Sequence, residues 1–280
     1  MGALMISVVL LTFNSSASIQ RTLDRVREIS DDIHAVDSYS KDDTVAILER
    51  NGVHVTQRPF KNYADQRNWA IDNLSLKYGW QMHVDADEEL EPALVAAIKA
   101  LNLEAVDTDG FIVGRKIVFM GQVLRFGGIA KTWHYRLFRN GFGRCEDRLY
   151  DQHFVSSGRT RTIDAFMLDH QEDTLAEWTA RHNRWSDMEA AEAAGPQENQ
   201  AGQIQPDFGG DRIQRARAKK GLYYRSPLFL RATGYFLFRY IVLLGFADGT
   251  AGLIYNVLQA FWFRFLVDAK IYEMHVRPKA

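Results

Sequence analysis

WQMHVDADEEL, residues 80–90, is an apolar run that ends in a cluster of carboxylates. Its first half has the composition of a buried strand, and four acids follow it closely: Asp85, Asp87, Glu88 and Glu89. Carboxylates repel one another and resist burial, so such a cluster needs a cation or a ligand rich in hydrogen-bond donors. The stretch therefore predicts a ligand site at the end of a strand. The last two acids are expected to be solvated or to lie at the start of a helix, where the helix dipole favours negative charge.

Strand and helix patterns alternate on both sides of this stretch. Apolar or β-rich runs lie at residues 6–13, 33–38, 53–59 and 80–86, with helical patterns at 19–29, 43–50, 64–74 and from Pro92 onward. Such alternation favours parallel strands with helices on both faces, and ligands then bind at the C-terminal ends of the strands. Later, residues 109–154 have a strand pattern with Gly-rich turns, and residues 173–195 have a helical one.

The composition is that of an ordinary globular chain, with 280 residues, 46% of them hydrophobic, and a net charge of −1. This charge gives no general attraction to nucleic acid, so none is expected as a partner. Cys145 is the only cysteine, which excludes an intrachain disulfide and fits a reducing compartment. The apolar run near the N-terminus has no basic residue before it, so it is predicted to be a core strand and not a signal peptide.

Three regions are predicted: a catalytic domain over residues 1–194, a flexible loop over 195–210, and a basic, aromatic C-terminal region over 211–280. Residues 211–239 hold eight Lys or Arg and a single acid, and an apolar segment overlaps and follows them. Arg231 and Arg239 interrupt that segment, so we expect amphipathic helices in a membrane interface and not a membrane span. The alternative is that these helices pack on the catalytic domain or form the interface of a homo-oligomer.

The strand-end acids indicate chemistry at a diphosphate. Asp37, Asp85 and Asp87 each end a predicted strand, and such ends converge at one edge of a parallel sheet. A divalent ion such as Mg²⁺ binds carboxylate oxygens and shares its coordination shell with a diphosphate. The chain has neither a P-loop nor a G-x-G-x-x-G motif after its first strand, which argues against a P-loop NTPase and an ordinary dinucleotide-binding protein.

Four ordered motifs together resemble a known family: SVVLLTFNSSASIQRTLDRV, AVDSYSKDDT, YADQRNWAID and WQMHVDADEEL. They are similar to inverting family 2 glycosyltransferases of the GT-A fold, especially bacterial enzymes that extend lipopolysaccharide core, capsule or lipid-linked glycans. RLFRNG, HNRWSDMEA and the C-terminal GFADGTAGLIYNVLQAFWFRFLVDAK extend the likeness. The resemblance implies an α/β fold, a Rossmann-like mixed sheet with helices on both faces, followed by C-terminal amphipathic helices.

The same resemblance implies an activity. A sugar would move from a nucleotide-diphosphate sugar, with a UDP-sugar expected first, to a hydroxyl of a membrane-associated glycan or glycolipid. The reaction would be a single metal-assisted displacement, and the enzyme would act at the cytoplasmic face of the inner membrane as a peripheral or monotopic protein.

The resemblance also assigns roles on the donor side. Thr12, Phe13 and Asn14 would border the base and ribose, and Asp37 would accept a hydrogen bond from the base. Arg67 would lie near the nucleotide or diphosphate. Asp87 would bind Mn²⁺ or Mg²⁺ directly, Asp85 would touch the ribose or the metal through water, and His170 would lie near the diphosphate as a metal ligand or as a structural residue.

On the acceptor side, the sequence departs from the family pattern. Many relatives carry a His-Glu pair after the RLFR strand, whereas this chain has CEDRLYDQHF. The distance from RLFR places Asp151 where the general base would be, and Glu146 and Asp147 are the alternatives. Trp133 and Arg136 are expected near the acceptor.

Two rival functions remain. A sugar nucleotidyltransferase also uses strand-end acids and a metal, but it usually has a Gly-rich loop with Arg or Lys after the first strand, which TFNSSASIQR lacks. A non-catalytic membrane-docking protein with a degenerate transferase domain would not need the intact Asp85 and Asp87 pair.

Overall fold

The computed structural model describes residues 5–128, 132–148, 150–195 and 202–277. The chain forms two compact units. The first comprises residues 1–115, 133–147 and 152–170, and the second comprises residues 116–132, 148–151 and 171–280.

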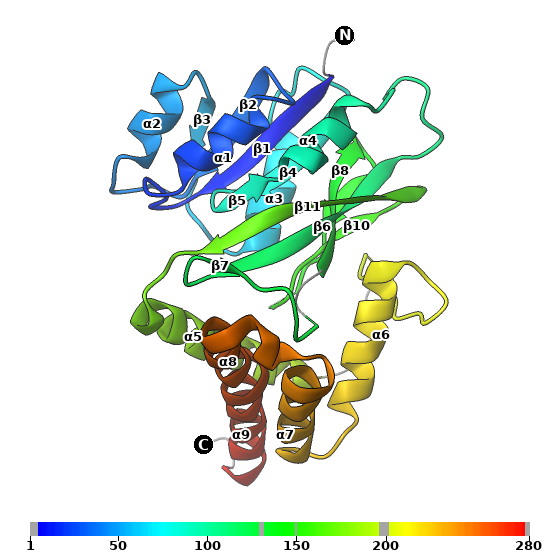
Figure 1. The fold of residues 1–280 in the computed structure, drawn as a ribbon. Coiled ribbons are helices and arrows are strands. Elements are labelled where there is room, and N and C mark those ends of the chain that lie inside the picture. The colour runs from blue at the N-terminus through cyan, green and yellow to red at the C-terminus, as the bar shows by residue number, and fades with distance from the viewer. Residues whose placement is uncertain (1–4, 129–131, 149, 196–201, 278–280) are drawn as a thin grey trace. The chain divides into compact units, whose positions relative to one another are not determined.

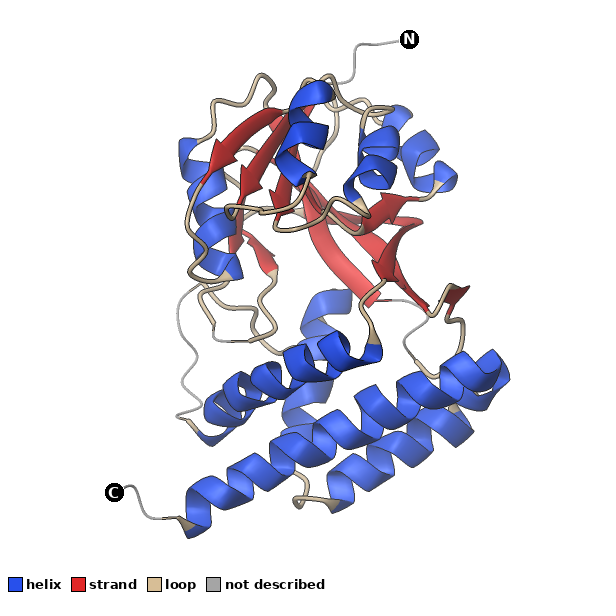
Figure 2. Cartoon of the chain, turned by 90° about the vertical axis from the view of Figure 1, so that its left-hand side faces the viewer, coloured by secondary structure: helices blue, strands red, loops and turns tan. Residues whose placement is uncertain are grey.

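A mixed β-sheet with helices on both faces forms the first unit (Figure 1, Figure 2). Its strand order is β3-β2-β1-β4-β8-β6-β11-β5, and β9 and β10 form a separate pair. The end of β6 and its partner β7 belong to the second unit. The strands are β1 (Ile6–Thr12), β2 (Asp32–Asp37), β3 (His54–Gln57), β4 (Trp80–Asp85), β5 (Glu88–Leu90), β6 (Gly110–Phe119), β7 (Gln122–Val123), β8 (Thr132–Arg139), β9 (Gly143–Cys145), β10 (Phe154–Ser156) and β11 (Thr160–Gln171). The predicted Rossmann-like mixed sheet is therefore confirmed.

The register aligns the strand ends that carry the acids. β1 runs parallel to β2, with Thr12 opposite Asp37, and parallel to β4, with Leu11 opposite Asp85. Beyond β4 the direction changes, because β8 is antiparallel to β4 and β5 is antiparallel to β11.

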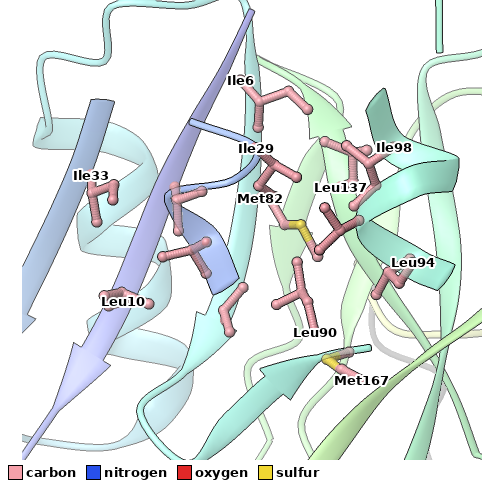
Figure 3. Close-up of a cluster of buried hydrophobic side chains, with 14 of the residues drawn as sticks. Ile6, Leu10, Ile29, Ile33, Met82, Leu90, Leu94, Ile98, Leu137 and Met167 are labelled. Atoms are coloured by element: carbon pink, nitrogen blue, oxygen red, sulfur yellow. The ribbon is translucent and has the colours of Figure 1, made fainter. Parts of the chain in front are cut away.

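Side chains of β1 alternate between two cores because successive strand residues point to opposite faces. On one face Val8 and Leu10 join a large cluster that includes residues from α1, α2 and α4 (Figure 3). On the other face Val9 packs with Ala70 of α3. The four helices of this unit are α1 (Ile19–Val26), α2 (Thr44–Arg50), α3 (Tyr63–Asn73) and α4 (Pro92–Lys99).

The second unit is mainly helical. Its helices are α5 (Leu175–Ala194), α6 (Arg212–Tyr224), α7 (Leu230–Leu237), α8 (Gly249–Tyr255) and α9 (Phe263–Val276), with π-helical stretches at Phe238–Val242 and Asn256–Trp262 and a 3₁₀ turn at Gly245–Asp248. Within the described residues, no single helix has the length and apolar character to cross a membrane. The segments Leu230–Val242 and Gly245–Val276 have the necessary length and apolar character only when they are taken together, and they are bent by 68° at the break between them.

The compact units do not coincide with the predicted regions. The helix α5, expected at the end of the catalytic domain, groups with the C-terminal helices in the second unit. Of the predicted flexible loop at 195–210, residues 196–201 lie outside the described residues.

Candidate active site

Asp85, at the end of β4, is held by two arginines. Arg67 of α3 donates from Nη2 to both carboxylate oxygens, at 2.9 and 3.1 Å, and Arg136 of β8 donates to Oδ2 at 2.9 Å. Burial alone would raise the pKa of Asp85, but the charges of Arg136 and Arg67 outweigh it and hold the pKa far below its usual range. Asp85 is therefore an anchored, ionised carboxylate.

Glu88 is not solvated, so the expectation for this residue was wrong. It is 1% exposed on the short strand β5, and its carboxylate accepts hydrogen bonds from Arg136 at 2.8 Å and from the Asp85 backbone N–H at 2.9 Å. Burial raises the pKa of Glu88, and the charge of Arg136 opposes that rise. The physical reason is that β5 returns antiparallel beside β11, which turns Glu88 inward toward Arg136.

Glu89 points to the other side of the strand. It accepts a hydrogen bond from Arg25 Nε at 3.2 Å, and its second oxygen lies 3.0 Å from His170 Nε2. The His170 backbone N–H donates to the Asp87 carbonyl at 3.1 Å. His170 is thus adjacent to the acidic turn, and its ring faces Glu89 in this structure.

Asp87 is the acid whose charge the protein compensates least. Its residue is exposed, but protein crowds the carboxyl group, and this desolvation together with Asp169, Asp85 and Glu88 raises the pKa well above the usual value. A carboxylate surrounded by negative charge has a strong tendency to bind a proton or a cation. Asp87 is therefore the carboxylate of this strand end best suited to bind a cation.

A divalent cation fits this arrangement through Asp87. Within the part of the chain that the structure describes, no three His, Cys, Asp or Glu side chains are grouped to enclose a metal. Asp85 already gives both oxygens to arginines, so a cation here would be held by Asp87 and by oxygens of a ligand. This composition suits Mg²⁺ or Mn²⁺, which are commonly bound by one or two carboxylates together with substrate phosphates.

The ends of β1 and β2 meet at Asp37. Its carboxylate is fully buried. One oxygen accepts hydrogen bonds from Thr12 Oγ1 at 3.0 Å and from Ser40 Oγ at 2.5 Å. The other oxygen accepts from the Ser40 backbone N–H at 2.9 Å and from Gln57 Nε2 at 3.1 Å. A carboxylate offers about four acceptor positions. Asp37 therefore ties the loops together, and a base that bonds to it would replace one of these donors.

The neighbouring loop is held in an unusual backbone conformation. Asn14 has a φ of +48°, in the left-handed region that non-glycine residues seldom occupy. Its N–H donates to Ser40 Oγ at 2.9 Å, and its Oδ1 accepts from the Lys41 N–H at 2.8 Å. Phe13 is consequently turned outward and is 58% exposed. The structure thus brings Thr12, Asn14 and Asp37 together, beside an exposed aromatic ring.

The two residues expected near the acceptor have different environments. Trp133 is half-buried, and its ring centroid lies 5.6 Å from that of Phe166. Arg136 is 3% exposed and bonds to Asp85 and Glu88. Its observed role is to hold acids, and a contact of either residue with the acceptor stays a prediction.

Asp151 belongs to the second unit and is bound by α6. Its Oδ2 lies 2.9 Å from Lys220 Nζ and 3.6 Å from Arg217 Nη1, and its φ is +56°. Of the two alternative bases, Glu146 is 1% exposed and accepts from the His153 N–H at 3.0 Å, whereas Asp147 is exposed. The assignment of the base stays a prediction.

The sequence reasoning missed two functional contacts. Arg136 bridges Asp85 and Glu88, and Arg115 Nη1 lies 3.4 Å from Asp169 Oδ2. A signal was present, because an arginine inside an otherwise apolar strand is seldom buried without an acidic partner. The identity of that partner depends on the sheet order, which the sequence does not reveal.

Comparison with known proteins gives a family match. A family model described as "Glycosyl transferase family 2" matches residues 7–168, more than half of the chain. An uncharacterized glycosyltransferase of Rickettsia conorii is 39% identical over 89 residues, which is 32% of this chain and 31% of the relative. The alignment thus spans about a third of the length of the first curated relatives.

Other similarities extend over nearly the whole chain. The lipopolysaccharide core biosynthesis glycosyltransferase LpsC of Rhizobium meliloti is 24% identical over 284 residues, covering 96% of this chain and 93% of LpsC. Among solved structures, S. aureus TarS has a TM-score of 0.46 at 15% identity, over 98% of this chain and 93% of that one. Glucosyl-3-phosphoglycerate synthase from Mycobacterium tuberculosis, with Mn²⁺ and UDP-glucose, has a TM-score of 0.33 at 21% identity, over 40% and 43%.

Proposed function

Because the chain belongs to glycosyl transferase family 2, we propose that it moves a sugar from a nucleotide-diphosphate sugar to a hydroxyl of a membrane-associated glycan or glycolipid. The observation that carries this proposal is the pairing of an anchored carboxylate, Asp85, with an uncompensated one, Asp87, at the C-terminal end of β4. Such an end is where open α/β sheets bind their ligands.

The donor is proposed to bind across the ends of β1, β2 and β4. The exposed Phe13 ring offers a surface for the base, and the loop held by Asp37 and Asn14 fixes the position of that ring. Asp85, ionised and held by two arginines, is proposed to accept a hydrogen bond from a ribose hydroxyl. A UDP-sugar is the first donor to test.

A divalent cation is proposed at Asp87. Of the other expected ligands, Asp85 gives both oxygens to arginines and the His170 ring faces Glu89, so each would have to exchange a partner to reach the cation. When bound, it would neutralise charge that grows on the departing diphosphate. Arg67 stays paired with Asp85 and adds positive charge beside the same strand end. Arg136 keeps Asp85 and Glu88 in place, so that the ionised carboxylates do not push the acidic turn apart.

The proposed reaction is one displacement with inversion. The acceptor hydroxyl attacks the anomeric carbon from the face opposite the nucleotide, and the bond to the diphosphate oxygen breaks. Asp151 is proposed as the general base that takes the hydroxyl proton. Lys220 and Arg217 orient its carboxylate.

The proposed acceptor is a lipid-linked or lipopolysaccharide-type glycan at the cytoplasmic face of the inner membrane. The similarity to LpsC, named for lipopolysaccharide core biosynthesis, over nearly the whole of both chains supports this choice. A nucleotidyltransferase and a non-catalytic docking protein are the rival functions. The family match and the acids at β4 favour the transferase.

A donor screen tests the proposal. Thermal unfolding of the whole protein would be followed with UDP-, GDP- and dTDP-sugars, each with and without Mn²⁺. We expect one nucleotide class to raise the melting temperature and to do so more strongly with Mn²⁺, because ligands that bind the folded state stabilise it. If no sugar nucleotide shifts the transition and none is turned over, the proposed function is wrong.

A further inference from the structure

We propose that the outer face of the α7–α9 hairpin is a docking surface for a lipid bilayer that contains anionic lipids. This inference extends the proposed function, on which it rests for its biological purpose, because an acceptor in a membrane must be reached from the membrane surface.

The first observation is an apolar stripe along α7 and the π-helical stretch after it, with exposed Thr233 and Gly234 between Leu230 and Leu237. The exposed large hydrophobic residues recur at helical spacing, so they share one face. They are Leu230, Leu237, Phe238, Ile241 and Val242, with exposed fractions between 45% and 71%.

A second stripe lies on the following segment, Gly245–Val276, which packs against α7. Leu253, Val257 and Phe265 are exposed at intervals compatible with one face of the helix. Ring contacts join this stripe to α7, because Phe265 lies 5.0 Å from Phe229, the residue next to Leu230. The two stripes therefore form one apolar surface, called here the hairpin face.

The charges that interrupt this segment in the sequence all turn away from the hairpin face. Within the described range 202–277, no charged residue between 226 and 266 is exposed. Arg231 pairs with the buried Asp268, and the buried Arg239 donates from Nε to the Gly127 carbonyl at 2.6 Å. The two arginines that argued against membrane insertion in the sequence thus do not reach the surface.

The remaining charges of this segment are also held inside the second unit. Asp248 accepts hydrogen bonds from the backbone N–H groups of Arg125 and Phe126, and Arg264 Nη1 lies 2.8 Å from Glu189 Oε1. An apolar surface with no exposed charge between residues 226 and 266 is unusual for a protein that stays in water.

The cations of α6, the helix that precedes α7 in the chain, favour a bilayer over a second copy of the chain. The helix α6, which precedes α7, exposes Arg212, Arg215 and Lys219, and it contains no acidic residue. Cationic side chains beside an apolar helical face are the combination that binds anionic lipid surfaces. Two copies meeting through this region would bring their own cations together.

The exposed acids of α5 lie on another side, whereas α9 itself carries one exposed acid, Glu273, whose carboxylate pairs with Arg277. In α9, Phe263, Val267 and Ile271 pack with Ala190 of α5, whereas Phe265 is exposed. Residues two apart on a helix point in nearly opposite directions. Exposed acids such as Glu177 and Asp187 belong to α5, and that helix covers the side of α9 away from the hairpin face.

The test is sedimentation of the full chain with vesicles of phosphatidylglycerol and phosphatidylethanolamine, compared with phosphatidylcholine vesicles. We expect binding to the anionic vesicles. Val242→Glu, at a site 64% exposed, should weaken it about tenfold or more, because a buried valine is worth at least that much. Met188→Glu, at a site 44% exposed on α5, is the matched control and should leave binding unchanged.

The charge contribution has its own pair of variants. Lys219→Gln should lower binding to anionic vesicles about fivefold, since one cation near such a surface contributes about that factor. Arg184→Gln, an exposed cation on α5, should leave binding unchanged.

Two outcomes would overturn the inference. One is equal vesicle binding by the wild type and Val242→Glu. The other is a dimer in light scattering that Val242→Glu dissociates, which would assign the hairpin face to a second copy. Sugar-nucleotide hydrolysis, measured on the same samples, tests the proposed function separately. A protein that binds vesicles but hydrolyses no donor would contradict the transferase proposal and would still support the docking surface.

Discussion

Arg136 holds the acidic cluster of the first unit together. Its Nη2 lies 2.9 Å from Asp85 Oδ2 and 2.8 Å from Glu88 Oε1, and both Arg136 and Glu88 are buried. The buried carboxylate of Glu88 depends on this guanidinium, because water cannot solvate it in place of Arg136.

Arg136→Met is therefore expected to destabilise the protein by about 3–5 kcal/mol, the usual cost of removing one partner of a buried ion pair. Chemical denaturation followed by circular dichroism would measure it. Arg144→Met is the control, because its pair with Asp72 is exposed and such pairs contribute about 0–1 kcal/mol. Equal stability of the two variants would contradict the role assigned to Arg136.

The residues of the candidate site were predictable to different degrees. Asp85 and Asp87 follow an apolar run directly, so local sequence was sufficient to select them. Glu88 was misplaced because its environment is set by β11 and by Arg136, which come far later in the chain. Burial of a charge is a property of the assembled sheet, and no local pattern encodes it.

At the scale of elements, α6 determines where Asp151 lies. Lys220 and Arg217 of this helix approach the carboxylate, and the backbone at Asp151 is in the left-handed region. A side chain held by two cations on a neighbouring helix is fixed in direction, as a general base has to be.

Asp151→Asn is expected to lower the rate of sugar transfer by about 10²–10⁴-fold, the range typical for general-base catalysis. Donor affinity should hardly change, so kcat falls while KM for the donor stays. Asp147→Asn is the control, since that residue is exposed. Loss of transfer in Asp147→Asn or in Glu146→Gln, with Asp151→Asn active, would move the base to one of the alternatives.

Helices and strands with a clear pattern of apolar residues were predicted well, and short elements were not. The strands β1, β2 and β4 and the helices α1 and α5 follow from apolar runs and helical spacing. The three-residue strand β5 carries no period of its own, and its pairing with β11 defines it. The C-terminal helices were expected, but their π-helical stretches at Phe238–Val242 and Asn256–Trp262 depend on packing within the second unit.

At the scale of the whole molecule, each unit has its own chemical character. The first carries Asp87, the carboxylate best suited to bind a cation, and the second combines an apolar hairpin face with a basic helix. Under the two proposals, the first unit would supply the diphosphate site and the second the membrane surface.

The most direct test of the central claim is donor hydrolysis by Asp87→Asn. The release of nucleoside diphosphate would be measured with Mn²⁺ for the wild type, Asp87→Asn and the control Asp164→Asn, which removes an exposed acid of the first unit. We expect Asp87→Asn to lose at least about 100-fold in rate, as for the removal of one electrostatic contact to the leaving group. It should fold at least as stably as the wild type, since Asp87 is repelled by neighbouring acids. Wild-type activity in a folded Asp87→Asn protein would contradict the assignment of the diphosphate site.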